Sequence, residues 1–342
     1  AAQAPLTAAL ARWLEGQWGA ITPWHVLLWP LSVLFGVLVA LRRGFYRLGY
    51  ARSFSLPVPV IVVGNITVGG SGKTPAVLWL VEFLKGQGHH PGVVSRGYGG
   101  TAFHPRAVTP NANPAVAGDE PVLLARRAGC PVWVGRDRVA TARELLQNHP
   151  ECDVLVSDDG LQHYRLRRAM EIAVVEYLRG FGNGLLLPAG PLRETPRRLK
   201  SVDAVLVNGA AWLENSAWLA MRLVGERFYR LGNGRAASAA DFAGTRVHAV
   251  AGIGNPRRFF DQLRELGLEV VEHPFPDHHV FTPRDFAFAG NAPVLMTEKD
   301  AVKCAGLDLP NAWVLPVDAE IDPALGFRIL EKLRKQHGRQ TA

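Results

Sequence analysis

A glycine-rich loop, GNITVGGSGKTP at residues 64–75, stands between an apolar run of β-branched residues and a helical stretch. A strand that runs into such a loop and then a helix lets backbone amides surround a phosphate group. The phosphate-binding pattern asks for Gly, four residues, then Gly-Lys-Ser/Thr. Gly72, Lys73 and Thr74 fit its end, but Thr67 stands where the first glycine belongs. The departure removes no side chain that would contact a nucleotide.

Each part of this loop has a chemical role in the phosphate-binding interpretation. Lys73 reaches the β- and γ-phosphates, Thr74 holds Mg²⁺, and the loop amides form an anion-binding nest. Pro75 does not disturb the helix start, because the first helical positions have no intrahelical N–H bond to lose. A plain glycine turn is the alternative. The predicted nucleotide-binding residues are Thr67, Gly69, Gly70, Ser71, Gly72, Lys73 and Thr74.

After residue 56, strand-like apolar runs alternate with helical stretches. PVPVIVVGN (57–65) and CDVLVSDDG (152–160) are buried-strand patterns, and PAVLWLVEFLKGQG (75–88) is a helix that ends at glycine. This alternation predicts a P-loop NTPase-like α/β fold, with a mostly parallel sheet and helices on both faces.

The alternation breaks near residue 225 and restarts with a new strand, loop and helix at 245–267. We therefore predict a helical segment over 1–56, a phosphate-binding core over 57–225 and a smaller α/β domain over 226–342. GIGNPRRFF within the last part has Arg257 where a dinucleotide fingerprint needs its third glycine, so we expect only a turn and a helix start there.

Composition excludes several classes of protein. With 48% hydrophobic and 20% charged residues, the 342-residue chain is globular and not disordered. Three scattered cysteines give neither a zinc pattern nor a disulfide framework, which fits a reducing compartment. We expect no nucleic-acid partner and no obligate protein partner.

The N-terminal segment is apolar and basic. Residues 16–41 contain no formally charged side chain, and a helix over 26–43 would be about 27 Å long, just short of the roughly 30 Å hydrocarbon core. Five arginines against one glutamate give residues 1–56 a net charge of +4. We predict a membrane-associated helix whose arginines face an anionic membrane surface and keep the rest of the chain cytoplasmic. A buried core helix is the alternative, whereas a signal peptide would not be followed by LRRG.

Two adjacent carboxylates follow the strand in VLVSDDGLQH. Asp158 and Asp159 would lie at the carboxyl edge of the sheet, where they would meet the metal held by Thr74. The alternative is a turn, because Asp before Gly is common there. Together with the glycine loop, the pair predicts nucleotide hydrolysis or phosphoryl transfer.

Seven motifs then point to one family. They are TVGGSGKTP, SRGYGG, GDEP, SDDGLQH, LLPAGPLRE, FPDHHVF and MTEKDAVK, in this order within residues 64–303. With the apolar N-terminal helix, this set resembles the tetraacyldisaccharide 4'-kinases, the lipid A 4'-kinases of Gram-negative bacteria. The resemblance covers nearly the whole chain, and Thr67 belongs to that family's own loop.

The resemblance implies a reaction and a base. The family transfers the γ-phosphoryl group of ATP, with Mg²⁺, to the 4'-hydroxyl of a tetraacylated glucosamine disaccharide 1-phosphate, at the cytoplasmic face of the inner membrane. Asp119 would then accept the hydroxyl proton, although the start of a helix is its alternative role. His278 would tune and orient Asp119, so the domain over 226–342 would close over the active site. His279 is a weaker candidate than His278 for the partner of Asp119. Asp277 would orient His278.

Other family motifs supply candidate ligands. Glu194 would be a further Mg²⁺ ligand or support one. The predicted substrate-binding residues, for the sugar or its 1-phosphate, are Arg96, Tyr98, Gln162, His163 and Arg193. Two other functions compete: a membrane-tethered P-loop GTPase or metallochaperone, and a non-enzymatic membrane adaptor. The first should carry an Asn/Thr-Lys-x-Asp motif, and the nearest match, TEKD at 297–300, has its lysine one place late.

Overall fold

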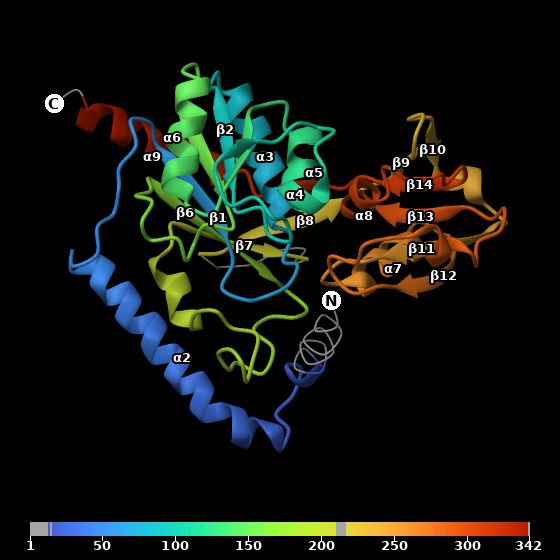
Figure 1. The fold of residues 1–342 in the computed structure, drawn as a ribbon, viewed down its shortest axis with the longest axis horizontal. Coiled ribbons are helices and arrows are strands. Elements are labelled where there is room, and N and C mark those ends of the chain that lie inside the picture. The colour runs from blue at the N-terminus through green and yellow to red at the C-terminus, as the bar shows by residue number, and fades with distance from the viewer. Residues whose placement is uncertain (1–12, 14–15, 210–216, 341–342) are drawn as a thin grey trace. The chain divides into compact units, whose positions relative to one another are not determined.

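The computed structural model describes residue 13 and residues 16–209 and 217–340 (Figure 1). Two compact units divide the chain. The first contains Ala1–Lys73, Asp159–Arg222 and Ile321–Ala342, and the second contains Thr74–Asp158 and Leu223–Glu320. The chain passes between the units at the end of the glycine loop and again between the two adjacent aspartates. The predicted domain boundaries at residues 56 and 225 stay predictions.

The first unit contains three neighbouring parallel strands and most of a fourth, β8, in the order β8-β7-β6-β1. Their bounds are β1 (Val60–Gly64), β6 (Met170–Glu176), β7 (Ala204–Asn208) and β8 (Leu219–Val224). Every residue of β1 and β7 is buried. Strands covered on both faces need apolar residues at every position, which is why these runs do not alternate.

The second unit contains a further set of strands in the order β5-β2-β4-β3. Their bounds are β2 (Pro91–Ser95), β3 (Arg106–Ala107), β4 (Val132–Val134) and β5 (Val154–Asp158). The first three in this order pair in parallel, and β3 pairs antiparallel to β4. Helix α6 (Arg138–Asn148) packs on β2 and β4. Gly92 makes room for it, because a Cβ there would lie 2.8 Å from Cδ2 of Leu145.

A six-stranded sheet, largely orange in Figure 1, also belongs to the second unit, in the order β10-β9-β14-β13-β11-β12. Its strands are β9 (Arg227–Arg230), β10 (Ala236–Ser238), β11 (Arg246–Ala251), β12 (Glu269–Pro274), β13 (Val294–Thr297) and β14 (Ala312–Leu315). The last four in the sheet order are parallel, and β9 pairs antiparallel to its two neighbours. Phe260 and Leu263 of α7 (Pro256–Glu265) share an apolar core with Trp313.

Further elements lie between these strands or after the last of them in the chain. They are α3 (Lys73–Gly86), α4 (Pro114–Ala117), α5 (Asp119–Arg127), α8 (Glu298–Lys303), α9 (Ala324–Gln340), β15 (Asp318–Ile321) and the 3₁₀ helices η1 (Pro196–Ser201), η2 (Ala239–Phe242) and η3 (Pro283–Phe286). Buried, mostly parallel strands alternating with helices confirm the predicted α/β class. The strand–glycine loop–helix order of β1 and α3 is consistent with a P-loop fold.

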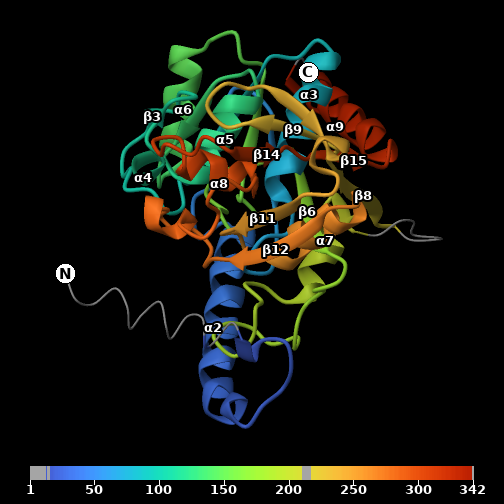
Figure 2. The same ribbon diagram turned by 90° about the vertical axis from the view of Figure 1, so that its right-hand side faces the viewer.

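The apolar N-terminal stretch forms α2 (Trp24–Arg47), which Figure 2 shows as one continuous helix. It extends the predicted 26–43 at both ends. Only His25 and Ser32 are buried in it, so the alternative of a buried core helix does not fit. Within the described residues, α2 alone has the length and composition to cross a membrane, with a mean hydropathy of 2.0 over its most apolar window.

Candidate active site

The glycine loop has the backbone that its sequence predicts. The strand β1 ends at Gly64 and α3 begins at Lys73. Gly69 and Gly72 have φ values of +93° and +92°, in the left-handed region that favours glycine. A Cβ at Gly72 would also collide with the side-chain amide of Asn208. Substitution of Gly72 would therefore be opposed by both the backbone and a neighbour.

Buried polar groups hold the loop from within. Nδ2 of Asn65 donates to Oγ of Ser71 over 3.1 Å, and Nδ2 of Asn208 donates to the Ser71 carbonyl over 3.0 Å. Thr67 forms an isolated antiparallel bridge with Leu192, so the unusual residue is tied to the segment that carries Arg193 and Glu194. Asn208 was not among the predicted residues. Its signal in the sequence is a polar side chain at the end of the buried run DAVLVN.

Lys73 lies in an ion-pair network with Asp159 and Arg193. Its Nζ is 3.6 Å from Oδ1 of Asp159. Nη1 of Arg193 is 3.0 Å from both carboxylate oxygens of the same aspartate. Asp159 has φ +45°, a conformation uncommon outside glycine. Two cations thus contact one carboxylate at the end of the glycine loop.

Asp158 faces different neighbours from Asp159. It is 1% exposed, and its Oδ2 accepts a hydrogen bond of 3.0 Å from Ser95, the last residue of β2. Its backbone carbonyl accepts from Arg138. Thr74 is half-buried at the start of α3. Mg²⁺ prefers such oxygen donors and is usually bound through one or two carboxylates plus phosphates. No group of three or more His, Cys, Asp or Glu side chains suited to a metal occurs among the described residues.

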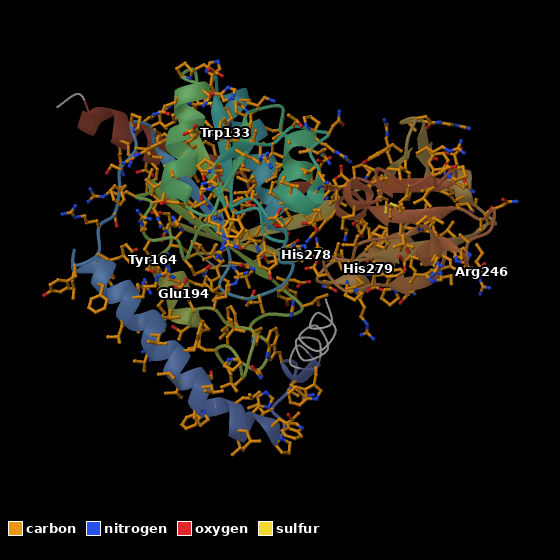
Figure 3. The ribbon with its side chains drawn as sticks, in the orientation of Figure 1. Trp133, Tyr164, Glu194, Arg246, His278 and His279 are labelled. Atoms are coloured by element: carbon orange, nitrogen blue, oxygen red, sulfur yellow. The ribbon has the colours of Figure 1, made fainter. Side chains whose placement is uncertain are left out.

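Glu194 is buried within hydrogen bonds. Its Oε2 accepts a hydrogen bond from Gln162 over 2.9 Å, and its Oε1 accepts one from the hydroxyl of Tyr164. Figure 3 labels Glu194 and Tyr164 next to each other. Gln162 also donates to the carbonyl of Asn65 at the start of the glycine loop. Burial and the charge of Glu194 raise the pKa of Tyr164 to about 12. In this arrangement Glu194 braces the loop, and its predicted role toward Mg²⁺ stays a prediction.

The predicted substrate-binding residues fall into separate groups. Gln162 and Arg193 belong to the networks of the first unit just described. Tyr98, exposed on the loop after β2, lies against His278 with 5.2 Å between the ring centroids. Arg96 is exposed on the same loop, and His163 is half-buried. The roles of these residues toward a sugar or its 1-phosphate remain proposals.

Asp119 and His278 meet although 159 residues separate them in the sequence. Asp119 is the first residue of α5 and is 4% exposed. Its Oδ2 lies 3.0 Å from Nδ1 of His278, and its Oδ1 accepts from the backbone N–H of Glu120. His278 has φ +60°. The cap of α5 is Gly118, so capping does not account for the contact with His278.

His279 has a different environment. Its Nε2 is 3.3 Å from a carboxylate oxygen of Asp285, and its ring packs between Phe275 and Phe281. Asp277, by contrast, accepts a hydrogen bond from the backbone N–H of His278. Figure 3 labels both histidines. The structure thus brings His278, and not His279, to Asp119.

Lys299 completes the cluster. Its Nζ lies 3.0 Å from Asp277, 3.1 Å from Glu120 and 3.8 Å from Asp119. Sequence reasoning missed this lysine, although MTEKD marks it as a polar residue just after a buried strand. No local pattern links it to carboxylates so distant in the chain.

The charges of the cluster shift its proton equilibria. Burial alone would raise the pKa of Asp119, but the hydrogen bond from His278 and the charge of Lys299 outweigh it and lower this pKa. Burial alone would lower the pKa of His278, but its hydrogen bond to Asp119 raises it. The surrounding carboxylates outweigh burial and raise the pKa of Lys299. Asp119 is therefore held as the carboxylate, the form that accepts a proton.

Comparison with known proteins decides the family. The family model described as tetraacyldisaccharide-1-P 4'-kinase matches residues 24–334. The chain belongs to this family. Two relatives named tetraacyldisaccharide 4'-kinase come from Methylobacillus flagellatus and an Azoarcus species. The first is 52% identical, over 96% of this chain and 97% of the relative, and the second is 55% identical, over 95% and 96%.

A solved structure shares the fold of this 4'-kinase family member. It is described as the "apo" form of LpxK from Aquifex aeolicus in complex with ATP. The two chains are 28% identical with a TM-score of 0.75, and the match covers 90% of this chain and 99% of the other. The resemblance drawn from the seven motifs is confirmed.

Proposed function

We propose that this chain phosphorylates the 4'-hydroxyl of a tetraacylated glucosamine disaccharide 1-phosphate with ATP and Mg²⁺, and that Asp119 accepts the hydroxyl proton. Family membership makes the chain a 4'-kinase of lipid A biosynthesis. The observation that carries the assignment of the base is the 3.0 Å contact between the buried Asp119 and His278.

On the nucleotide side, the protein positions and neutralises charge. The loop amides and Lys73 would hold the β- and γ-phosphates, with Lys73 exchanging Asp159 for phosphate. Thr74, Asp158 and, once Lys73 has turned to phosphate, Asp159 would hold Mg²⁺, which would help to neutralise the charge that develops on the phosphates. Arg193 would keep the carboxylate of Asp159 in place during that exchange. The oxygen donors and the positive φ glycines support this assignment.

On the acceptor side, the proposed chemistry is the transfer of one proton from the attacking hydroxyl. Asp119 would take it from the attacking hydroxyl as the oxygen bonds to phosphorus. His278 would orient the carboxylate by donating from Nδ1, and Lys299 would keep it ionised. Tyr98, packed on His278, would lie beside the acceptor sugar. Lys299 is thus a positioning residue, because it acts through Asp119.

His278 and Lys299 both lie beyond residue 225, whereas Asp119 lies before it. We propose that the C-terminal part closes over the acceptor and delivers these two side chains. Their contacts with Asp119 support the idea. Trapping the closed form would test it: a cysteine cross-link between the two parts should stop turnover, and reduction should restore it. Full turnover with the link formed would exclude a closing motion.

We also propose that α2 places the enzyme at the cytoplasmic face of the inner membrane. Its exposed apolar side chains and the basic residues at its end support this location. Deletion of residues 1–43 should release the protein from membranes and reduce activity on the lipid more than basal ATP hydrolysis. If the truncated protein still sediments with membranes, another surface is the anchor.

One assay separates the kinase from its rivals: ATP and GTP consumption, each measured with and without the acylated disaccharide. We expect ATP consumption that depends on the disaccharide. The GTPase alternative is not favoured, because Asp300 of TEKD is fully buried and accepts from the backbone N–H of Gly252, and Lys299 faces Asp119. Consumption of GTP without lipid would reverse this conclusion.

A further inference from the structure

A basic groove of about 750 Å³ lies at the C-terminal end of α2, within the first unit. Six arginines and one glutamate contribute to its lining. The arginines are Arg43, Arg47, Arg52, Arg167, Arg168 and Arg198. None of them has a role in the phosphoryl transfer described above. The groove therefore gathers positive charge for which the kinase mechanism gives no use.

Hydrogen bonds and ring contacts fix the walls of this groove. The hydroxyl of Ser53 donates to the carbonyl of Tyr164 over 3.0 Å, and the backbone of Phe54 pairs with that of its neighbours at 165 and 167. The ring of Tyr46 lies 5.8 Å from that of Tyr164. Arg43 donates to Ser201 over 2.8 Å. The end of α2 is thus held against the wall of the groove.

The charges in the groove are unequally matched. Arg168 and Arg198 both donate to Oε1 of Glu171, over 2.9 and 2.6 Å. Arg47, Arg52 and Arg167 are exposed and form no ion pair within the part of the chain that the structure describes. A phosphate is the ligand for which several convergent guanidinium groups are suited, because each forms charge-assisted hydrogen bonds with its oxygens.

Exposed apolar side chains continue from α2 to the edge of the groove. Phe45 and Leu48 are 51% and 74% exposed, and Tyr50 is 79% exposed. Apolar side chains next to unpaired arginines match the boundary between lipid chains and phosphate headgroups. A soluble phosphate would have no use for the apolar side chains.

We propose that the groove binds the phosphate of an anionic phospholipid headgroup while α2 lies in the membrane. The inference rests on the proposed membrane association and goes beyond it, because it assigns anionic recognition to three residues and not to overall charge. Arg47, Arg52 and Arg167 contact the phosphate, and Phe45 and Leu48 enter the lipid beside it.

Vesicle flotation of the full chain tests this assignment. Wild-type protein is floated with phosphatidylcholine vesicles, with or without phosphatidylglycerol, beside Arg47→Gln, Arg52→Gln and Arg167→Gln. The matched control is Arg42→Gln, which removes the same charge from the same helix outside the groove lining. Each groove variant should bind the anionic vesicles roughly fivefold more weakly. Binding to neutral vesicles should not change.

Three outcomes would reject the groove as a headgroup site, and a fourth would reject the proposed membrane association as well. An equal loss in Arg42→Gln would mean diffuse attraction, and an equal loss on phosphatidylcholine vesicles would mean that the arginines either bind any lipid phosphate or support α2 itself, and do not recognise an anionic headgroup. A raised KM for the disaccharide in neutral detergent would assign the groove to the substrate's 1-phosphate. Wild-type protein that floats with neither vesicle would reject the proposed membrane association as well. Unchanged kinase activity in detergent beside lost anionic binding separates this site from the active site.

Discussion

Two clusters in this molecule have the same arrangement, in which one carboxylate contacts two basic side chains. In the first unit, Asp159 lies between Lys73 and Arg193. In the second, Asp119 lies between His278 and Lys299. They differ in exposure, because the side chain of Asp159 is 26% exposed and that of Asp119 is 4% exposed.

That difference fits the two roles proposed for these carboxylates. A lysine that must turn to phosphate needs a partner that solvent can help to release, and a partly exposed ion pair is weakened by water. A base that must stay ionised in a buried site needs cations held close, since burial favours its neutral form. In the proposed mechanism, the pair around Asp159 would therefore exchange its partner, and Asp119 would serve as a fixed base.

The largest effect should come from the base. Asp119→Ala should lower kcat about 10²- to 10⁴-fold while leaving the KM for ATP nearly unchanged, because the proposed task of this carboxylate is to take the proton of the acceptor hydroxyl. Steady-state kinetics with both substrates varied would measure this. Glu120→Gln is the matched control, since Glu120 contacts Lys299 but not His278. A change confined to the KM for ATP would make Asp119 a residue that shapes the helix start.

The second-largest effect should come from Lys73, in the cluster around Asp159. Lys73→Ala should reduce phosphoryl transfer about 10²- to 10³-fold, because the charge that stabilises the β- and γ-phosphates is lost. Turnover at saturating disaccharide is the measurement, and Lys85→Ala near the other end of α3 is the control. Turnover like that of the wild type would remove the glycine loop from the mechanism.

The paired aspartates should show a smaller, metal-dependent effect. Asp159→Asn should depress turnover and weaken the apparent affinity for Mg²⁺ about 10- to 100-fold, the range for residues that support a metal site. Asp158→Asn should act likewise. A Mg²⁺ titration of turnover measures the effect for each variant, and that of Asp158→Asn should be smaller or equal. If neither variant alters the titration, both carboxylates serve only the turn.

Lys299→Met should have the smallest effect and lower kcat about tenfold. This loss lies in the range expected for two residues coupled in one ion-pair network. The charge of Lys299 lowers the pKa of both Asp119 and His278. Without it both pKa values rise, so less Asp119 is ionised at low pH. Both limbs of the pH–rate profile should therefore move to higher pH. Lys299→Arg should keep the wild-type profile, and an unshifted profile in Lys299→Met would reduce this lysine to a structural role.

Local patterns predicted more of one cluster than of the other. The glycine loop with Lys73 and the two aspartates each follow from a short local pattern, the first from a strand, a spacing and a helix start and the second from the end of a strand. Thr67 could be interpreted only through the family, because its bridge to Leu192 depends on tertiary structure.

The second cluster was largely hidden from local reasoning. Nothing near residue 119 indicates that His278 and Lys299 would meet it, and Lys299 was missed. The hydrogen bonds that Glu194 accepts from Gln162 and Tyr164 are equally absent from any local pattern, and its role toward Mg²⁺ stays a prediction. Contacts of long sequence separation are set by packing of whole elements, which periodicity does not describe.

A double-mutant cycle of Asp119 and His278 tests most directly whether they act as one unit. We measure kcat for Asp119→Ala, His278→Ala and the double variant, with pH–rate profiles of wild type and His278→Ala. Residues that manage one proton together should give losses that do not add, so the double variant should be little slower than Asp119→Ala. The limbs of the profile should shift when His278 is replaced. Losses that multiply, with an unshifted profile, would contradict the account.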